Sequence, residues 1–101
     1  MADKKELEGI VAEIENGVAT LHLSEEKAKE LESPSFIELP QVGKKIFQGD
    51  VIGSIETAKS VENIKTPVSG EVIEINSELK DHPELATEDP LGKGFLIKVK
   101  L

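Results

Sequence analysis

The chain has 101 residues, of which 20 are acidic and 12 are basic, so it carries a formal net charge of −8 at pH 7. This length forms one domain without room for a separate catalytic module, and no block of Lys or Arg could neutralise phosphates, which excludes nucleic acid as an expected partner. Cysteine is absent, which excludes disulfides, thiolate metal sites and redox chemistry by the protein's own sulfur.

Hydrophobic residues make up 38% of the chain, but its aromatic residues are only 3 Phe. We therefore expect a packed core built mainly from Val, Ile and Leu, which favour strands. No apolar run approaches the length of a membrane span, and residues 1–9 lack the apolar segment of a signal peptide. These features predict a cytoplasmic protein with no membrane contact.

Residues 7–23 predict a β-hairpin around Asn16 and Gly17, because both residues tolerate the positive φ of a tight turn. One short helix is predicted near residues 24–32. Ser24 is placed as its N-cap, acidic residues follow in its first turn, and Pro34 lies just beyond its end.

A brief strand is predicted over residues 35–40, and Gly43 and Gly49 mark turns after it. A second hairpin is predicted over residues 51–72, where two runs of β-branched residues flank the polar segment 56–60. The last strand, residues 95–101, places Phe95, Ile97 and Val99 on one face. The pattern predicts a mainly β fold, a small β-sandwich or flattened barrel with one short helix.

A weak internal repeat occurs in the second half of the chain. The segments that begin at Gly49 and Gly70 both read glycine, acid, Val, Ile. If this is a structural repeat, each glycine takes positive φ at the end of a turn, and the two Val-Ile pairs start matching strands in two sheets. Coincidence is the alternative interpretation.

Candidate catalytic and metal-binding residues fail on spacing or on missing partners. His22 and His82 lack the spacing of helical metal ligands, so both are interpreted as structural or solvated. The acids within residues 84–89 lack the ordered pattern of a calcium loop, and residues 92–94 are too short for a phosphate-binding loop. Three serines have no visible His and Asp partners: Ser24, Ser60 and Ser69. We therefore expect a protein that is not an enzyme.

A single lysine, Lys59, stands in the segment where the second hairpin turns. A lysine in such a turn projects away from the sheet, so another enzyme can reach its amine without unfolding the protein. From position alone, an ordinary solvated lysine is the simpler interpretation.

Residues 55–76 resemble the attachment hairpin of the lipoyl and biotinyl carrier domains, whose target lysine occupies this turn. Residues 76–99 resemble one branch, the H proteins of the glycine cleavage system. In that family an Asn, a Pro-Glu-Leu, and an Asp-Pro followed by two glycines and an aromatic residue come in this order. The matching residues are Asn76, Pro83, Glu84, Leu85, Asp89, Pro90, Gly92, Gly94 and Phe95. The resemblance covers roughly residues 8 to 100.

The resemblance implies two antiparallel sheets of the lipoyl/biotinyl hybrid type, with residues 1–101 as a single lipoyl domain. It also implies that lipoic acid is attached covalently to Lys59 as an amide. Glu56 matches the acid that helps the lipoylating enzyme choose this lysine, and Gly70 matches the turn glycine that follows the hairpin.

The implied function is that of a non-catalytic carrier, expected to be a monomer. Its lipoyl-lysine arm would shuttle an aminomethyl intermediate and reducing equivalents between the glycine cleavage enzymes. The implied partners are a lipoate ligase or lipoyl transferase, glycine decarboxylase, aminomethyltransferase and dihydrolipoyl dehydrogenase.

Several positions depart from the family's pattern. Residues 8–10 replace its His-Glu-Trp, Glu32 and Ser33 replace a Gly-Asp after the helix, and Leu91 and Phe95 replace its Tyr and Trp. The chain also stops at Leu101, where the family normally adds a C-terminal helix. These departures bear on which pathway the protein serves, and none of them lies in the hairpin that carries Lys59.

Other functions remain as alternatives. An H-like lipoyl carrier outside glycine cleavage would serve lipoate relay, sulfur metabolism or a redox-regulatory partner. A biotin carrier is disfavoured, because Ala58 and Ser60 stand where such domains place methionines. A detached lipoyl domain of a 2-oxoacid dehydrogenase would not predict residues 83–95. The last alternative is an unmodified interaction module.

Overall fold

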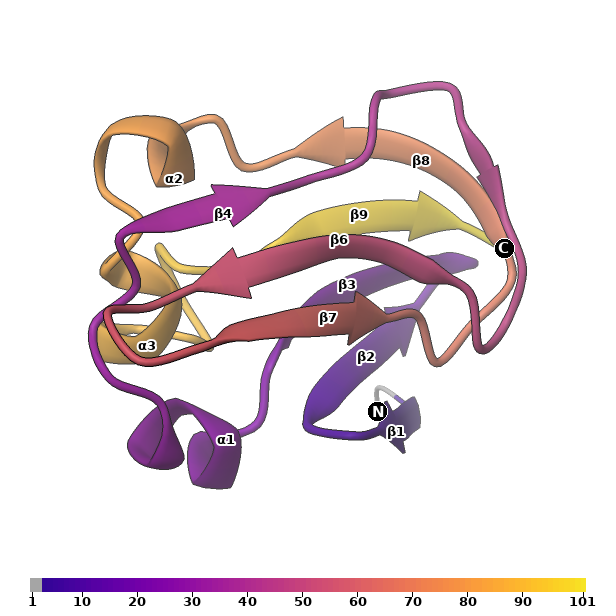
Figure 1. Cartoon of the computed structure of the whole chain (residues 1–101). Helices are drawn as coiled ribbons and strands as arrows, with labels where there is room; N and C mark the ends of the chain where they lie inside the picture. Colours follow the sequence, from indigo (N-terminus) through magenta and orange to yellow (C-terminus); the bar gives the residue numbers. More distant parts are fainter. Residues whose placement is uncertain (1–2) are drawn as a thin grey trace.

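The computed structural model describes residues 3–101, which form two antiparallel sheets and three short helices. The larger sheet has the strand order β1 (Asp3–Leu7), β2 (Ile10–Glu15), β3 (Val18–Leu23), β9 (Ile97–Lys100), β8 (Gly70–Ile75), β5 (Lys45–Ile46). The smaller sheet has the order β4 (Phe36–Glu38), β6 (Val51–Glu56), β7 (Val61–Lys65). The smaller sheet lies across the curved larger one (Figure 1). The predicted mainly β fold of two antiparallel sheets is confirmed.

The first hairpin forms as predicted, with Asn16 at φ 52° and Gly17 at φ 78° between β2 and β3. A further strand, β1, precedes it and was not predicted. Its turn to β2 consists of Glu8 at φ 47° and Gly9 at φ 84°. Both turns thus have two residues with positive φ, which is the geometry that matches strand twist in a tight hairpin. Glutamate rarely adopts this conformation, so the sequence does not indicate the first of these turns.

The predicted helix near residues 24–32 is α1 (Glu25–Glu30), and Ser24 caps it by accepting a hydrogen bond from the amide of Lys27 at 3.0 Å. Two single-turn helices, α2 (Glu78–Asp81) and α3 (Leu85–Glu88), are present in addition to the one helix that the sequence predicted. Four residues are too few to show helical periodicity, so the pattern could not reveal them. Within residues 3–101, no helix is long and apolar enough to cross a membrane.

The core lies between the two sheets and consists of aliphatic side chains, as the composition predicts. The fully buried large side chains include Leu21, Ile55, Ile64, Val72 and Ile97, which come from both sheets. Burying each such side chain stabilises the fold by about 1.5–3 kcal/mol. The smaller sheet, and with it the second hairpin, is therefore fixed to the larger one by packing.

Two details of the predicted strands are wrong. In the apparent repeat, Val51 is 51% exposed and Ile52 is buried, whereas Val72 is buried and Ile73 is 40% exposed. The two Val-Ile pairs face opposite ways, so the segments are not equivalent. In the last strand, Ile97 and Val99 are buried as predicted, but Phe95 precedes β9 and is half-buried, with Lys98 Nζ 5.6 Å from its ring centre.

An Asn side chain joins the end of β8 to the loop before β9. Asn76 is buried, and its Nδ2 donates to the carbonyl oxygens of Lys93 at 2.6 Å and Phe95 at 2.8 Å. Its Oδ1 accepts from the amide of Glu78 at 3.2 Å, at the start of α2. These hydrogen bonds fix α2 and this loop relative to the sheet. Replacing Asn76 would leave their buried partners unsatisfied, which costs free energy of folding.

Candidate functional site

The second hairpin presents Lys59 in its turn, as the sequence predicts. Strand β6 ends at Glu56 and β7 begins at Val61, so residues 57–60 form the connection. The amide of Thr57 donates to the carbonyl oxygen of Ser60 at 2.8 Å, which closes the turn. The Lys59 side chain is 80% exposed. Its amine is thus open to an approaching enzyme, while the strands on either side are fixed in a sheet.

Thr57 stabilises the turn through hydrogen bonds of its side chain. It was not singled out from the sequence. It is buried, and its hydroxyl oxygen accepts hydrogen bonds from the amides of Lys59 at 3.3 Å and Ser60 at 3.2 Å. This is a local side-chain turn that threonine can form two or three residues ahead in the chain. The spacing from Thr57 to Lys59 is the sequence signal that could have indicated it.

Glu32 lies beside Lys59, although it follows α1 and belongs to a distant part of the sequence. Its Oε1 atom is 3.5 Å from Lys59 Nζ, and the two side chains are 47% and 80% exposed. An ion pair this exposed contributes at most about 1 kcal/mol, because water solvates both charges. Glu32 therefore places a carboxylate near the Lys59 amine, and the amine stays exposed to solvent.

Glu56, the predicted recognition acid, is exposed at the end of β6. Its backbone carbonyl accepts hydrogen bonds from Ser35, from the amide at 2.7 Å and from the hydroxyl at 3.2 Å. In the strand register it lies opposite Phe36 on β4 and Val61 on β7. The backbone of Glu56 is thus fixed within the smaller sheet, and its side chain lies on the same hairpin end as Lys59.

The other lysine of the hairpin, Lys65, is placed differently. It ends β7, its side chain is 36% exposed, and its Nζ atom is 3.0 Å from Glu8 Oε2. Two acids that depart from the family's pattern, Glu8 and Glu32, therefore each contact one hairpin lysine. Of the two lysines, Lys59 is the more exposed and lies in the turn.

The prediction for Gly70 is wrong in its physical reason. Gly70 is the first residue of β8, is paired with Ile46 of β5, and is not among the glycines with positive φ. A Cβ atom at this position would lie 2.2 Å from the carbonyl oxygen of Lys100 and 2.7 Å from Val99 Cγ1. Gly70 is thus a strand residue that lets β9 approach closely. Strand β8, which it begins, starts near the end of the second hairpin that lies away from the β6–β7 turn (Figure 1).

The remaining candidates have structural surroundings. The ring nitrogens of buried His22 lie 2.7 Å from Glu13 Oε2 and 2.7 Å from the carbonyl oxygen of Leu23, and His82 ends α2. Ser69 Oγ accepts a hydrogen bond from the amide of Gln48 at 2.8 Å. Within residues 3–101, no three His, Asp or Glu side chains gather in a way that could hold a metal ion.

Comparisons with known proteins identify relatives of this chain. The family model described as glycine cleavage H-protein matches residues 2–101. The chain is 42% identical over 90 residues to the glycine cleavage system H protein of Rubrobacter xylanophilus, covering 89% of this chain and 71% of that protein. It is 38% identical over 90 residues to the probable glycine cleavage system H protein of Aeropyrum pernix, covering 89% of this chain and 63% of that protein.

A solved structure also resembles the fold. The crystal structure of a glycine cleavage system H protein from Mycobacterium marinum superposes with a TM-score of 0.89 at 26% identity. The match covers 97% of this chain and 83% of that one. The sequence and the fold therefore point to the same set of relatives.

Proposed function

The chain belongs to the glycine cleavage H-protein family, and from this premise we propose that it is a lipoyl carrier in glycine cleavage that holds lipoate on Lys59. In this proposal residues 1–101 act as one lipoyl domain. The names of the relatives favour glycine cleavage over an H-like carrier that serves another pathway. The observation that carries the attachment site is the exposed Lys59 amine in a turn whose backbone Thr57 holds in place.

The surroundings of Lys59 fit a covalently attached acyl chain. Its neighbours Ala58 and Ser60 are small and exposed, so an acyl group on the amine would displace no packed side chain. Acylation would end the contact between Lys59 and Glu32, which costs little because the pair is exposed. The amine can therefore be modified while the fold stays unchanged.

Lipoate on this amine supplies a disulfide that accepts an aminomethyl group and two electrons and is later reoxidised. The chain's own part is to hold the arm at one fixed point. Its sequence contains no cysteine, so no thiol of the protein can exchange with that disulfide. A tether of this kind raises the effective concentration of the head group at a docked enzyme. The chain thus acts as a non-catalytic carrier.

The proposed partners are a lipoate ligase or lipoyl transferase, glycine decarboxylase, aminomethyltransferase and dihydrolipoyl dehydrogenase. Glu56 is the acid that the lipoylating enzyme recognises in this proposal, because it is exposed and three residues before Lys59. A cationic group on the enzyme that approaches Lys59 would meet this carboxylate at the hairpin end.

The test of the attachment site is the variant Lys59→Arg, which keeps the charge and removes the amine that can be acylated. The wild-type protein, incubated with lipoate, ATP and a lipoate ligase, should gain the mass of one lipoyl group. The variant should fold normally and stay unmodified. A lipoyl group on Lys65, or on the variant at the wild-type level, would show that the site is elsewhere.

The pathway is tested with glycine decarboxylase from the same cell. Lipoylated carrier should support exchange of labelled bicarbonate with glycine, at a rate comparable to that of a longer H protein of the family. The Lys59→Arg variant gives the background rate. Exchange at background, despite complete lipoylation, would eliminate the role in glycine cleavage and leave a lipoyl carrier of another pathway.

A further inference from the structure

Two large apolar side chains lie exposed at the end of the smaller sheet that carries Lys59. Phe36 on β4 is 53% exposed, and Val61 on β7 is 62% exposed. Both lie opposite Glu56 in the strand register, one on each side. Directly opposite residues of neighbouring strands point to the same face, with Cβ atoms about 4.5–5.5 Å apart. Phe36, Glu56 and Val61 therefore form one row across all three strands, which we call the tip row.

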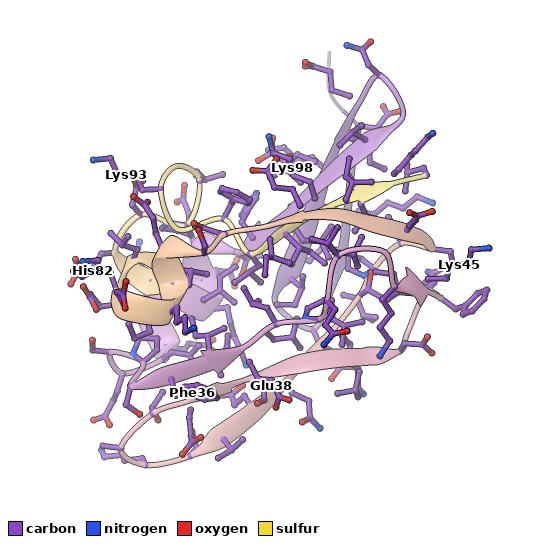
Figure 2. All side chains as sticks on the ribbon, turned by 90° about the horizontal axis from the view of Figure 1, so that it is seen from above. Phe36, Glu38, Lys45, His82, Lys93 and Lys98 are labelled. Atoms are coloured by element: carbon purple, nitrogen blue, oxygen red, sulfur yellow. The ribbon has the colours of Figure 1, made fainter. Side chains whose placement is uncertain are left out.

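The tip row differs from the row that follows it on the same face. Two residues further along each strand, the register aligns Glu38, Ser54 and Asn63, all of them polar. In Figure 2, Phe36 and Glu38 are labelled on β4, at the side of the molecule opposite to the sheet that carries Lys98. On this face the apolar tip row thus borders the Lys59 turn, and the next row away from the turn is polar.

The tip row lies where an enzyme that acylates Lys59 would contact the protein. In acylation, the deprotonated Nζ forms a bond to the carbonyl carbon of an activated lipoyl group. The bond from that carbon to its phosphate or thiolate leaving group breaks, and the leaving group takes the electron pair. Nζ then gives up one further proton, to the leaving group or to a base of the enzyme, which leaves a neutral amide. The active site must therefore reach Nζ itself and cover the residues around the turn. An enzyme that acts only on the head group of the arm does not have to cover these residues.

We propose that the tip row is the docking surface for the lipoylating enzyme, with Phe36 and Val61 packing against apolar side chains around a basic group that pairs with Glu56. The proposal rests on Lys59 being the lipoyl site. Binding surfaces commonly have a few apolar anchors around a charged contact, and these carry most of the affinity. Glu32, 3.5 Å from the Lys59 amine, adds a second acid facing the same partner.

The test compares two double variants of the full chain. Phe36→Thr with Val61→Thr removes the apolar part of the tip row and places at both positions a β-branched residue that favours strands. The matched control is Phe47→Thr with Val51→Thr, which changes a Phe that is 64% exposed and a Val that is 51% exposed, both away from the turn. Lipoylation by a purified lipoate ligase with ATP and lipoate is followed by intact mass.

The tip-row variant should lose about tenfold or more in kcat/KM, mainly through a higher KM. The control should stay within about twofold of wild type. Lipoylation of the tip-row variant at the wild-type rate would overturn the proposal, and so would equal losses in both variants. A wild-type protein that is not lipoylated at all would contradict the proposed lipoyl-carrier function as well. A wild type that is lipoylated, with a tip-row variant that is lipoylated equally fast, would contradict the docking surface alone.

A competition measurement separates docking from acylation and from folding defects. Unmodifiable Lys59→Arg protein, added in excess, should inhibit lipoylation of wild type. The same protein with the two tip-row changes should not inhibit, although its circular dichroism and melting temperature match those of Lys59→Arg. Equal inhibition by both would overturn the proposal. Normal lipoylation combined with weakened bicarbonate exchange would assign the row to glycine decarboxylase instead, and would overturn it too.

Discussion

Within the β6–β7 turn, one buried hydroxyl determines how the Lys59 backbone is held. Thr57 Oγ1 accepts from two consecutive amides, those of Lys59 and Ser60. The exposed amine is thus attached to a backbone with little freedom of its own, although it lies at the outermost point of a hairpin. A rigid attachment point reduces the conformational entropy that is lost when an enzyme binds the turn.

Replacing Thr57 with Val should loosen this turn, because Val keeps the shape and removes the hydroxyl. The amides of Lys59 and Ser60 should exchange with solvent faster, and lipoylation should slow several-fold. Global stability should fall by only about 1 kcal/mol, the usual net value of such a hydrogen bond. Hydrogen exchange measured by NMR and the lipoylation rate check this.

Thr57→Ser serves as the control, since it restores the hydroxyl and should restore both quantities. Unchanged amide exchange in Thr57→Val would mean that the closing bond between Thr57 and Ser60 is sufficient to hold the turn.

At the scale of strands, glycines of this chain serve two different physical purposes. Gly43 has φ 95° and open space around its Cβ position, whereas at Gly70 a Cβ atom would lie 2.2 Å from the Lys100 carbonyl oxygen. The first glycine is needed for its backbone conformation. The second is needed because β8 and β9 approach each other closely.

Gly70→Ala should therefore destabilise the protein more than Gly43→Ala. Positive φ costs a residue such as Ala about 1–2 kcal/mol, and forcing a methyl group against a backbone atom typically costs about 1–3 kcal/mol or more, because the strand must move. Urea unfolding of both variants measures the difference in the free energy of unfolding. A smaller loss for Gly70→Ala would show that β9 can shift to accept the methyl group.

The sequence predicted those elements whose signals are local. Asn16-Gly17 predicts its hairpin, Ser24 predicts α1, and the β-branched runs around residues 56–60 predict the second hairpin. It could not predict α2 and α3, each only a single turn. The reason for a glycine at position 70 was also hidden, because it depends on contact with residues about thirty positions later.

From the sequence, only those residues of the candidate site that lie close together along the chain could be predicted. Lys59 and Glu56 follow from the hairpin and from the family resemblance. Glu32 and Phe36 lie more than twenty residues before Lys59 and come to this hairpin end only through the packing of α1 and the pairing of β4. Such neighbours require the register of the strands, which a single sequence does not specify.

For the whole molecule, the exposed edges of the sheets decide whether two copies could pair through their backbones. Two edge strands are short, β5 with two residues and β4 with three. Strand β1 carries two lysines, and β7 forms ion pairs through Glu62 with Lys27 and through Lys65 with Glu8. Short strands and charged side chains are the usual protection against edge pairing.

The protein should therefore be a monomer of 11.0 kDa, and its net charge of −8 adds mutual repulsion between copies. Sedimentation equilibrium at about 10 and about 100 μM should give the same mass, in low salt and in about 0.5 M salt where surface charges are screened. A mass that rises with concentration would show that an edge or the tip row mediates self-association.

The β6–β7 turn and the C-terminus lie at opposite ends of the molecule (Figure 1). The amide of Leu101 donates to the carbonyl oxygen of Gly17 at 2.9 Å, so this end of the chain is held against the β2–β3 turn. A biotin tag, a fluorophore or a link to a sensor chip added after Leu101 would leave the Lys59 end facing solution. Immobilised in this way, the protein would present every copy in the same orientation to enzymes flowing past.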